Sequence, residues 1–423
     1  MSTNTAVPFF RPDIGRAEID EVVAVLRSGW LTTGAVTERF EEEFAASIGG
    51  RHALAVNSCT AALHLAVNAL GLRPGEGVLV PTMTFAATAE VVRYEGAVPI
   101  LVDCDPETGH LDLDAAQRLL TGAQRCRGVF TSFAGIMPVH VGGHMMDVDA
   151  VRRLAEAWRL WVVEDAAHAF PAARRSRPHQ PWRRCGQGTG DVTCFSFYAN
   201  KTITTGEGGM AVTDRLDLAD RMRLMSLHGL SHDAWARYAS HGRWDYQIVA
   251  AGYKYNLTDI AAAIGVHQLE RAEKMRARRE QIAQRYREAF ATVDEITLPA
   301  APEDCLHSWH LFPIMLRLDR LTIDRDQFIE ELRRRGVTPS VHWRPLHMHP
   351  YYQRTYGYRA GDCPQAAARF ARIVSLPIFS AMTTEEIAHV ISTVTDVVAA
   401  NRRGGGLARG SATSRTFSGG VSG

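Results

Sequence analysis

The chain has 423 residues, 46% of them hydrophobic and 22% charged, and its formal net charge is +1 at pH 7. Such a chain is long enough for a large domain and a smaller one, and its composition is that of a globular protein. The balanced charge gives no electrostatic case for nucleic-acid binding. No uninterrupted apolar run reaches the ~20 residues that a membrane helix needs.

The N-terminal stretch MSTNTAVPFFRP lacks the apolar core of a secretory signal. Seven cysteines, an odd number without CxxC spacing, indicate reduced thiols. We therefore expect a cytoplasmic protein without a membrane span.

In chain order, an extended arm precedes a helix at 16–28. Short apolar strands then alternate with helical stretches such as 113–120, which predicts an α/β fold with a mostly parallel sheet. The expected strands are 54–56, 78–80, 98–102, 161–163 and 192–197.

A long charged helix at 259–291 is expected to lead to a smaller domain with a strand at 309–316, a helix at 324–335 and a last helix from 384. The C-terminal residues hold too few apolar groups to fold. We predict an N-terminal arm at 1–15, a large domain at 16–265, a bridging helix with a small α+β domain at 266–400, and a disordered tail at 401–423.

Lys201 is the most informative residue, in the stretch CFSFYANKTITTGEGGM at 194–210. It lies on a predicted turn, five residues after the hydroxyl of Ser196 and just before several glycines. A lysine placed in this way suits an amine that forms a Schiff base with a carbonyl cofactor. A lone lysine before a loop is more often only exposed, so the interpretation depends on other segments.

Asp165 follows the predicted strand 161–163, and ligands of parallel α/β sheets bind beyond the carboxyl ends of the strands. A carboxylate there can pair with the protonated pyridine nitrogen of pyridoxal phosphate, or it can simply cap a helix. His168, three residues later, is equally compatible with a hydrogen bond to the cofactor's ring oxygen and with a core histidine.

A third segment, at 57–66, reads NSCTAALHLA after a short strand. Ser58, Cys59 and Thr60 open a predicted helix, whose free N–H groups favour an anion such as phosphate. An ordinary capped helix explains the same residues. Phe85, after the strand 78–80, can lie against a cofactor ring or pack in the core.

Together these segments resemble the DegT-type sugar aminotransferases, which are pyridoxal-phosphate enzymes of fold type I. The similarity runs through residues 8–395 and is most specific around Asp165 and Lys201. The matching stretches are GWLTTG (29–34), NSCTAALHLA (57–66), PTMTFAAT (81–88), PVHVGGHMMDVDAV (138–151), VEDAAHAF (163–170), CFSFYANKTITTGEGGM (194–210), YKYNLTDIAAAIGVHQLERA (253–272) and VHWRPLHMHPYY (341–352).

The resemblance implies a role for each matching residue. Lys201 would bond the cofactor and shuttle the proton, while Asp165 would face the pyridine nitrogen and His168 the ring hydroxyl. The other residues that it implies are Ser58, Cys59, Thr60 and Ser196 at the phosphate, Phe85 over the ring, Asn256 at the phosphate of a neighbouring subunit, and Trp30, Leu31, Thr32, Thr33, His342 and Trp343 along the sugar-nucleotide cleft. A site shared in this way implies a homodimer.

Three features depart from the family pattern. Cys59 stands where the family often has glycine, and residues 121–137 replace a usually shorter link. The basic segment 174–184 replaces a brief hairpin, and we interpret it as a solvated loop rather than a phosphate contact.

The glycine-rich HVGGH at 140–144 lacks the helix and glutamate of a zinc protease, so no metal is expected.

The implied activity is transamination of a nucleotide-linked keto-sugar, such as a 4-keto-6-deoxyhexose, with L-glutamate as amino donor and pyridoxal or pyridoxamine phosphate as cofactor. The amino-sugar would serve glycan or natural-product biosynthesis. Alternatives are a sugar dehydratase, whose relatives carry histidine in place of Lys201, an aminocyclitol aminotransferase, and a non-catalytic cofactor-binding regulator.

Overall fold

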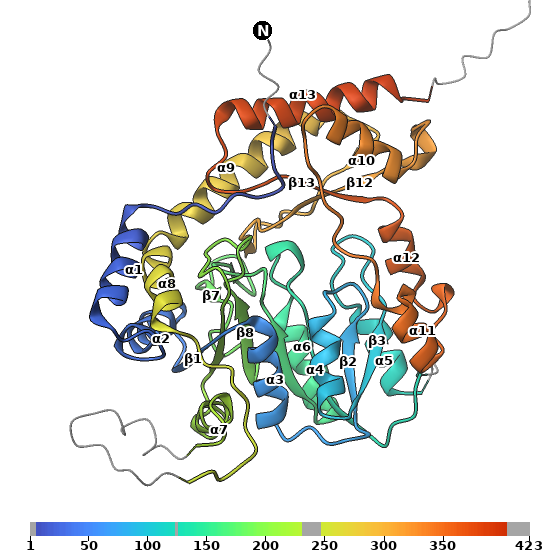
Figure 1. Ribbon diagram of the computed structural model, residues 1–423. Helices are drawn as coiled ribbons and strands as arrows, with labels where there is room; N and C mark the ends of the chain where they lie inside the picture. Colours follow the sequence, from blue (N-terminus) through green and yellow to red (C-terminus); the bar gives the residue numbers. More distant parts are fainter. Residues whose placement is uncertain (1–5, 123–125, 231–246, 404–423) are drawn as a thin grey trace, which may run out of the picture.

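A computed structural model describes residues 6–122, 126–230 and 247–403. Its centre is a seven-stranded sheet in the order β1-β9-β8-β5-β4-β2-β3 (Figure 1). Only β9 is antiparallel to its neighbours, so the other strands all point the same way. The strands are β1 (His52–Val56), β2 (Gly77–Pro81), β3 (Val98–Val102), β4 (Phe133–Ile136), β5 (Trp161–Asp165), β8 (Val192–Ser196) and β9 (Gly209–Thr213).

Helices cover both faces of this sheet because its strands are apolar on both sides. In β2, Val78 and Val80 belong to the core on one face, whereas Leu79 belongs to the core on the other. The first face packs against α3 (Cys59–Ala69), α4 (Ala87–Tyr94) and α7 (Leu216–Ser226). The second packs against α2 (Ala35–Ile48), α5 (Leu113–Leu120), α6 (Val148–Trp158) and α8 (Asp259–Glu270).

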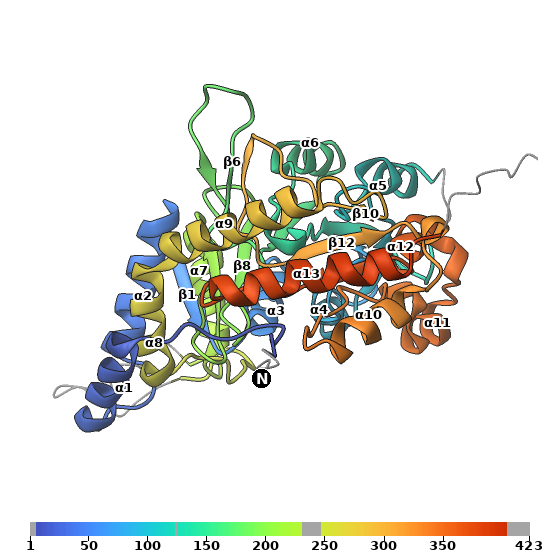
Figure 2. The same cartoon turned by 90° about the horizontal axis from the view of Figure 1, so that it is seen from above.

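A second core gathers around a small antiparallel sheet in the C-terminal part of the chain. Helices α9 and α13 lie side by side over it, as Figure 2 shows from above. Val7 of the N-terminal arm is fully buried in the same core. The elements are β10 (Ile296–Thr297), β12 (Phe312–Leu316), β13 (Ile373–Leu376), α9 (Ala272–Phe290), α10 (Arg325–Arg334) and α13 (Thr384–Ala400). The boundary between domains at 265/266 stays a prediction.

The remaining elements lie at the periphery. They are α1 (Arg16–Ser28), α11 (Pro350–Tyr356), α12 (Pro364–Phe370), and a three-stranded sheet of β6 (Ala173–Arg174), β7 (Arg183–Arg184) and β11 (Cys305–Leu306). Strands β6 and β7 enclose the basic segment 174–184, which projects from the body (Figure 2). Residues 176–181 are exposed, as the solvated-loop interpretation expects. Within the described ranges, no helix is long and apolar enough to cross a membrane.

Two predicted elements differ in the structure. The helix predicted at 259–291 is two helices, α8 and α9. They separate at Arg271, because its amide donates to the carbonyl of Gln268 only three residues earlier (3.2 Å), which makes a tighter turn than an α-helix has. The strand predicted at 309–316 begins only at Phe312, since Trp309 has a left-handed backbone with φ of 50°.

Two segments interpreted as irregular contain ordered structure. The link 121–137 includes β4, a central strand paired with β2 and β5, so it is more than an insertion. In the predicted tail, Arg402 forms a 2.7 Å ion pair with the buried Glu295. The rest of the tail, 404–423, lies outside the described residues, as do 1–5 of the arm and 123–125 of the link.

Candidate active site

The predicted site residues gather where the parallel strands end. Asp165 is the last residue of β5 and Ser196 the last of β8, and these two strands are parallel neighbours. Ser58 follows β1, which points the same way because β9 is antiparallel to both β1 and β8. The carboxyl edge of the sheet therefore carries all three groups, as expected for a ligand site in this class of fold.

Lys201 lies on a closed loop just beyond β8. Its amide donates to the carbonyl of Tyr198 (2.9 Å), and Tyr198 pairs in turn with Gly206. Gly206 has φ of 82°, a conformation that favours glycine. Burial lowers the pKa of Lys201 to about 8, against the opposite influence of Cys59 and Asp165. At neutral pH a much larger fraction of this amine is therefore unprotonated, and able to react with a carbonyl, than in an exposed lysine.

Asp165 is buried, and both of its carboxylate oxygens accept hydrogen bonds. The Thr88 hydroxyl donates to Oδ2 at 2.7 Å and the Ala167 amide to Oδ1 at 3.1 Å. Burial raises the pKa of this carboxyl, and the two donors together with the charge of Lys201 offset part of the rise. A cationic ring nitrogen beside Asp165 would favour the ionised form further.

The start of α3 forms the third wall of the site. Ser58 caps the helix by accepting from the amide of Ala61 (3.1 Å), which leaves the amides of Cys59 and Thr60 without an intrahelical acceptor. A Cβ on Gly209 would lie 2.4 Å from the carbonyl carbon of Ser58. Glycine in β9 is therefore what allows the sheet to approach this helix end.

His168 is buried next to Lys201. Its Nδ1 accepts from the amide of Gly142 (3.3 Å), and its ring stacks on Trp343 with centroids 5.2 Å apart. Burial lowers its pKa well below the usual value, and the charges of Lys201 and His342 act in the same direction. The ring is therefore neutral.

These residues fit a polar aromatic cofactor. A narrow pocket is lined by Ala167, His168, Phe170, Ser196, Lys201, Thr202, Ile203 and His310. On both sides of Lys201, the buried Oδ1 of Asn200 and Oγ1 of Thr202 have no hydrogen-bond partner among the described residues. Buried polar atoms are rarely left without a partner, so a group beyond the chain itself is expected here.

Four of the predicted substrate residues, Trp30 to Thr33, lie in a loop that contacts Asn256, predicted at a neighbouring subunit's phosphate, and the start of α8. Asn256 Nδ2 donates to the hydroxyl of Thr33 (2.7 Å), and the carbonyl of Thr32 accepts from the amide of Asp259 (3.2 Å). The neighbouring Trp30 and Leu31 are exposed, as is Phe85, at 64%. Asn256 also pairs with Val56, two residues before Ser58.

His342 and Trp343 reach the site by different routes. Trp343 stacks on His168, whereas His342 bonds through Nδ1 to the hydroxyl of Ser375 (2.9 Å) and stacks on Phe9. Burial lowers the pKa of His342 to about 3, and the charge of Lys201 contributes. Trp343 thus contacts His168, a residue of the pocket, and His342 is a neutral group near enough to Lys201 for the charge of the lysine to act on it.

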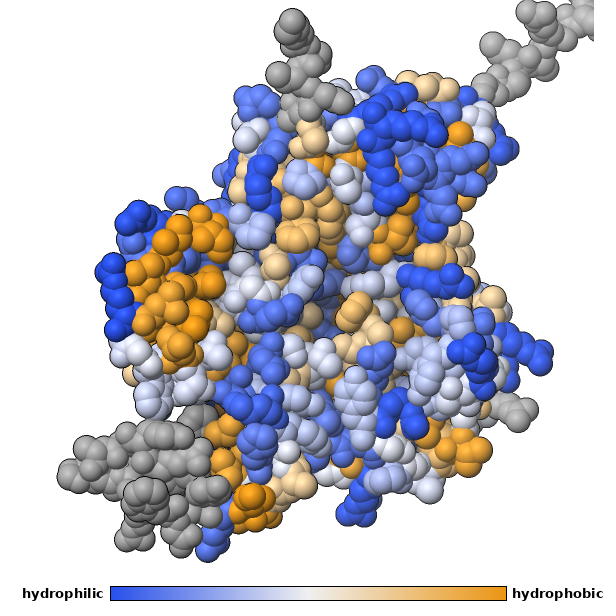
Figure 3. Space-filling view, viewed as in Figure 1, coloured by the Kyte–Doolittle hydropathy of each residue, from blue (hydrophilic) through white to orange (hydrophobic). Residues whose placement is uncertain are grey.

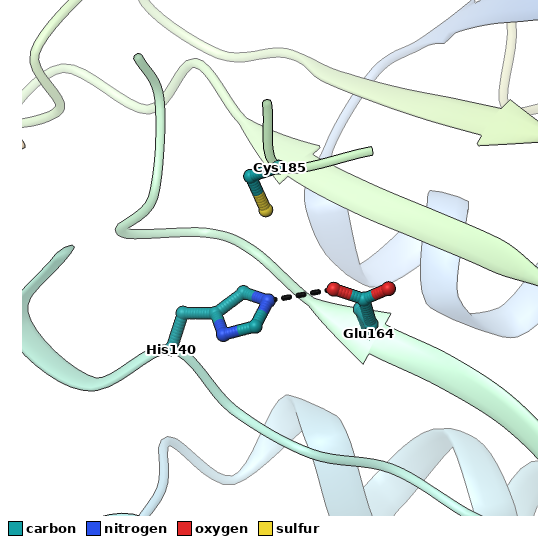
Figure 4. A group of neighbouring side chains, drawn as sticks. All are labelled: His140, Glu164 and Cys185. Carbon is teal, nitrogen blue, oxygen red and sulfur yellow. Dashed lines mark hydrogen bonds and ion pairs between the residues drawn. The ribbon is translucent and has the colours of Figure 1, made fainter. Parts of the chain in front are cut away.

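A second buried cluster consists of His140, Glu164 and Cys185 (Figure 4). His140 Nε2 and Glu164 Oε2 are 2.7 Å apart, and Nδ1 of His140 accepts from the amide of Met146 (3.1 Å). Since Nδ1 is an acceptor, the neutral ring carries its proton on Nε2 and donates it to Glu164. A metal on Nε2 would need that proton removed, so the cluster is better described as a buried hydrogen-bonded pair.

Sequence reasoning missed two residues of the site. Thr88, which holds Asp165, lies at the end of the matching stretch PTMTFAAT, so its position carried a signal. His310 lines the pocket of Lys201, and its ring lies against that of His168 at a tilt of 43°, with centroids 4.2 Å apart. Its sequence neighbourhood, SWHLF, lies 109 positions after Lys201 (310 − 201) and offered no motif to connect the two.

Known proteins resemble this chain over nearly its whole length. The spore coat polysaccharide biosynthesis protein SpsC of Bacillus subtilis is 40% identical over 396 residues, covering 93% of this chain and 98% of SpsC. The PLP form of Spr1654 from Streptococcus pneumoniae superimposes with a TM-score of 0.81 at 30% identity, covering 93% of this chain and 99% of that chain. The sugar aminotransferase CalS13 from Micromonospora echinospora gives 0.78 at 29% identity, covering 92% and 99%.

The fold and the lysine and carboxylate at its strand edge define the class: a pyridoxal-phosphate-dependent aminotransferase of fold type I. Spr1654 is also known in a pyridoxamine-phosphate form, with a TM-score of 0.82. The sequence profile of the DegT/DnrJ/EryC1/StrS aminotransferase family matches residues 12–395. The chain belongs to this family.

Proposed function

We propose that the enzyme transfers the amino group of L-glutamate to a nucleotide-linked keto-sugar, such as a nucleoside-diphosphate 4-keto-6-deoxyhexose. The observation that carries this proposal is Lys201, an amine whose pKa burial lowers to about 8 at the strand edge that also holds Asp165. The similarity to CalS13, a sugar aminotransferase, supports a sugar as the acceptor of the amino group. The product would be an amino-sugar for glycan or natural-product synthesis.

The residues that would hold the cofactor follow from their positions. Lys201 Nζ would bond it, the Asp165 carboxylate would pair with its ring nitrogen, and Ser196 would bind its phosphate together with the α3 amides of Cys59 and Thr60. Ser58 would help to shape this anion site, because its hydroxyl is held in place by the hydrogen bond that it accepts from the amide of Ala61. Phe85 would cover the ring, and its exposure leaves the face of the phenyl group available.

When bound, pyridoxal phosphate supplies an electron sink and a carbon that carries the amino group. The chain supplies the proton transfers and the orientation. Lys201 Nζ, once free, would take a proton from the amino-bearing carbon of the donor and deliver it to the cofactor carbon that receives the amino group, and a pKa near 8 suits both directions at neutral pH. Asp165, held by Thr88, keeps the negative charge that a protonated ring nitrogen requires.

The substrate cleft would lie between two groups of residues. Trp30 to Thr33 lie in the loop between α1 and α2, while Trp343 stacks on His168 of the pocket and follows His342 in the chain. Trp30 and Trp343 offer flat faces for a sugar or base. Because His342 is neutral, it would bind hydroxyl groups rather than phosphates.

A homodimer with shared sites is part of the proposal. Figure 3 shows a hydrophobic patch over α1, and exposed apolar side chains on and beside this helix are Ile14, Ile19, Leu26, Trp30 and Leu31. Continuous apolar surface of this kind typically marks an interface. Asn256, beside the same loop through Thr33, would then contact the phosphate in the partner's site.

A panel of keto-sugar nucleotides assayed with glutamate tests the proposal. We expect amino-sugar formation with at least one member and none from Lys201→Ala. Loss of a sugar hydroxyl without amination would instead indicate a dehydratase, which the lysine at 201 disfavours. A cofactor absorbance that glutamate leaves unchanged would indicate a binding protein without turnover.

A further inference from the structure

His168 is held from four directions. The Gly142 amide donates to its Nδ1 (3.3 Å), and the hydroxyl of Ser308 donates to its carbonyl oxygen (2.6 Å). Its ring contacts those of His310 and Trp343, with centroids 4.2 Å and 5.2 Å away. No described residue forms a hydrogen bond with its Nε2. This nitrogen alone is left for a ligand in the pocket that His168 lines with Lys201.

The Gly142 amide is positioned by a turn that only glycine allows. Gly142 and Gly143 have φ of 68° and 96°, in the short 3-10 segment Val141–Gly143. A Cβ on Gly143 would lie 1.8 Å from the Ser308 hydroxyl oxygen and 2.8 Å from the carbonyl oxygen of His168. The amides of Ser308 and Leu311 bond back to the turn (3.1 Å each). The glycines of the HVGGH stretch thus serve close packing around His168.

A backbone amide fixes which ring nitrogen carries the proton. An amide can only donate, so Nδ1 of His168 must accept, and a neutral ring then has its proton on Nε2. Burial and the charge of Lys201 keep the ring neutral by lowering its pKa. His140 follows the same rule with the Met146 amide, and there Nε2 donates to Glu164.

We propose that the Gly142–Gly143 turn fixes the tautomer of His168, so that the contact with the ring oxygen of pyridoxal phosphate that the family resemblance implies is made by a donating Nε2–H. The inference depends on the cofactor position in the proposed function. Here His168 is the contacting residue, and Gly142 and Gly143 are positioning residues. A donor in this place stabilises negative charge on the ring oxygen, whereas the other tautomer would present a lone pair and repel it.

The tautomer can be measured without cofactor. We would label the histidines of the cofactor-free protein with ¹⁵N, record long-range ¹H–¹⁵N spectra, and assign His168 by its loss in His168→Gln. We expect an unprotonated Nδ1 and a protonated Nε2 throughout the neutral pH range. A proton on Nδ1, or a doubly protonated ring near pH 7, would overturn the proposal whatever the sugar substrate proves to be.

Two substitutions of His168 separate the loss of its hydrogen-bond donor from the loss of its packing. His168→Gln retains a donor at the Nε2 position, while His168→Asn can accept from Gly142 but has no group that reaches as far. We expect the dissociation constant of pyridoxal phosphate to rise less than about threefold in the first and about tenfold or more in the second. Equal affinities would contradict a donated hydrogen bond.

Variants of the turn test its role. Gly143→Ala should displace the Gly142 amide and give His168 a mixture of tautomers in the same spectra. Ser308→Ala removes the bond to the carbonyl but keeps the Gly142 amide, so the tautomer should not change. If Gly143→Ala folds and His168 keeps a single Nε2–H tautomer, the turn does not set it. Failure of the proposed function would appear separately, as cofactor that binds without reaching Lys201.

Discussion

The hydroxyl of Thr88, on α4, donates a 2.7 Å hydrogen bond to Oδ2 of Asp165 at the end of β5. Thr84 lies 2.7 Å from the same hydroxyl and extends the chain of polar groups. This bond opposes the effect of burial, which raises the pKa of Asp165. Thr88 therefore helps to keep charged the carboxylate that would pair with the cofactor's ring nitrogen in the proposed function.

Replacing Thr88 with valine should raise the pKa of Asp165 further, because a buried carboxylate loses a donor. The acidic limb of the activity profile would then move to higher pH, since the ionised form is lost sooner as pH falls. We expect pyridoxal phosphate to bind about tenfold more weakly. Thr88→Ser keeps the hydroxyl and should behave as the wild type. An unmoved acidic limb in Thr88→Val would exclude this role.

The pKa of Lys201 predicts how its reaction with the cofactor depends on pH. Burial lowers this pKa to about 8, and only the neutral amine attacks a carbonyl. In cofactor-free protein, the initial rate of borohydride-trapped attachment at Lys201 should rise with pH and level off above about 8. A midpoint near 10.5, the value of an exposed lysine, would show that the site does not desolvate the amine.

Gly206, in the loop after Lys201, and Gly209, at the start of β9, form a matched pair for a test. A Cβ on Gly209 would meet the backbone of Ser58 and Cys59 at 2.4–2.5 Å, whereas nothing lies within 4 Å of one on Gly206. Gly209→Ala should displace the start of α3 and weaken binding of inorganic phosphate as well as of the cofactor. Gly206→Ala should cost only about 1 kcal/mol of stability, through its positive φ. Titration of both variants with phosphate, combined with urea unfolding, checks this.

The buried pair of His140 and Glu164 should matter for stability rather than for metal binding. Glu164→Leu leaves the Nε2–H of His140 buried without an acceptor, and we expect it to lower the free energy of unfolding by about 1–3 kcal/mol relative to Glu164→Gln. Urea unfolding of both variants measures the difference. Chelation should leave the wild-type curve unchanged. Stoichiometric zinc in the purified protein would contradict the hydrogen-bonded description.

The exposed face of α1 tests the dimer. Ile19 and Leu26 are 51% and 52% exposed, and charging both, as Ile19→Glu with Leu26→Lys, should split a dimer that buries them. Sedimentation velocity would report a monomer, and cofactor affinity should fall because Asn256 would no longer reach the partner's phosphate. Arg334→Glu, on the exposed side of α10, is a control that should stay dimeric.

The sheet could be predicted from sequence because its strands are short apolar runs between turn signals. The strands predicted at 54–56, 78–80 and 161–163 all lie within observed strands, and the helix 113–120 has the observed bounds. Strand β4 was not predicted, because its residues, FAGI, are few and include Gly135. A Cβ there would lie 2.2 Å from the ring of Trp161, so packing rather than strand propensity selects glycine.

The support around the site could not be predicted, because it depends on contacts between distant segments. Ser308 bonds to the carbonyl of His168 across 140 positions, and Thr88 reaches Asp165 across 77. No pattern in the stretch SWHLF indicates that the ring of His310 will contact that of His168. The family resemblance supplied the residues expected to contact a cofactor, whereas only the folded chain shows what holds them.

Mass analysis after borohydride reduction tests the central claim most directly. The protein would be incubated with pyridoxal phosphate, reduced, digested and sequenced by tandem mass spectrometry. We expect the cofactor mass on Lys201 alone, and its loss after prior incubation with glutamate, which converts the cofactor to its unattached amine. Modification spread over exposed lysines, or a Lys201 peptide without the added mass, would contradict the assignment.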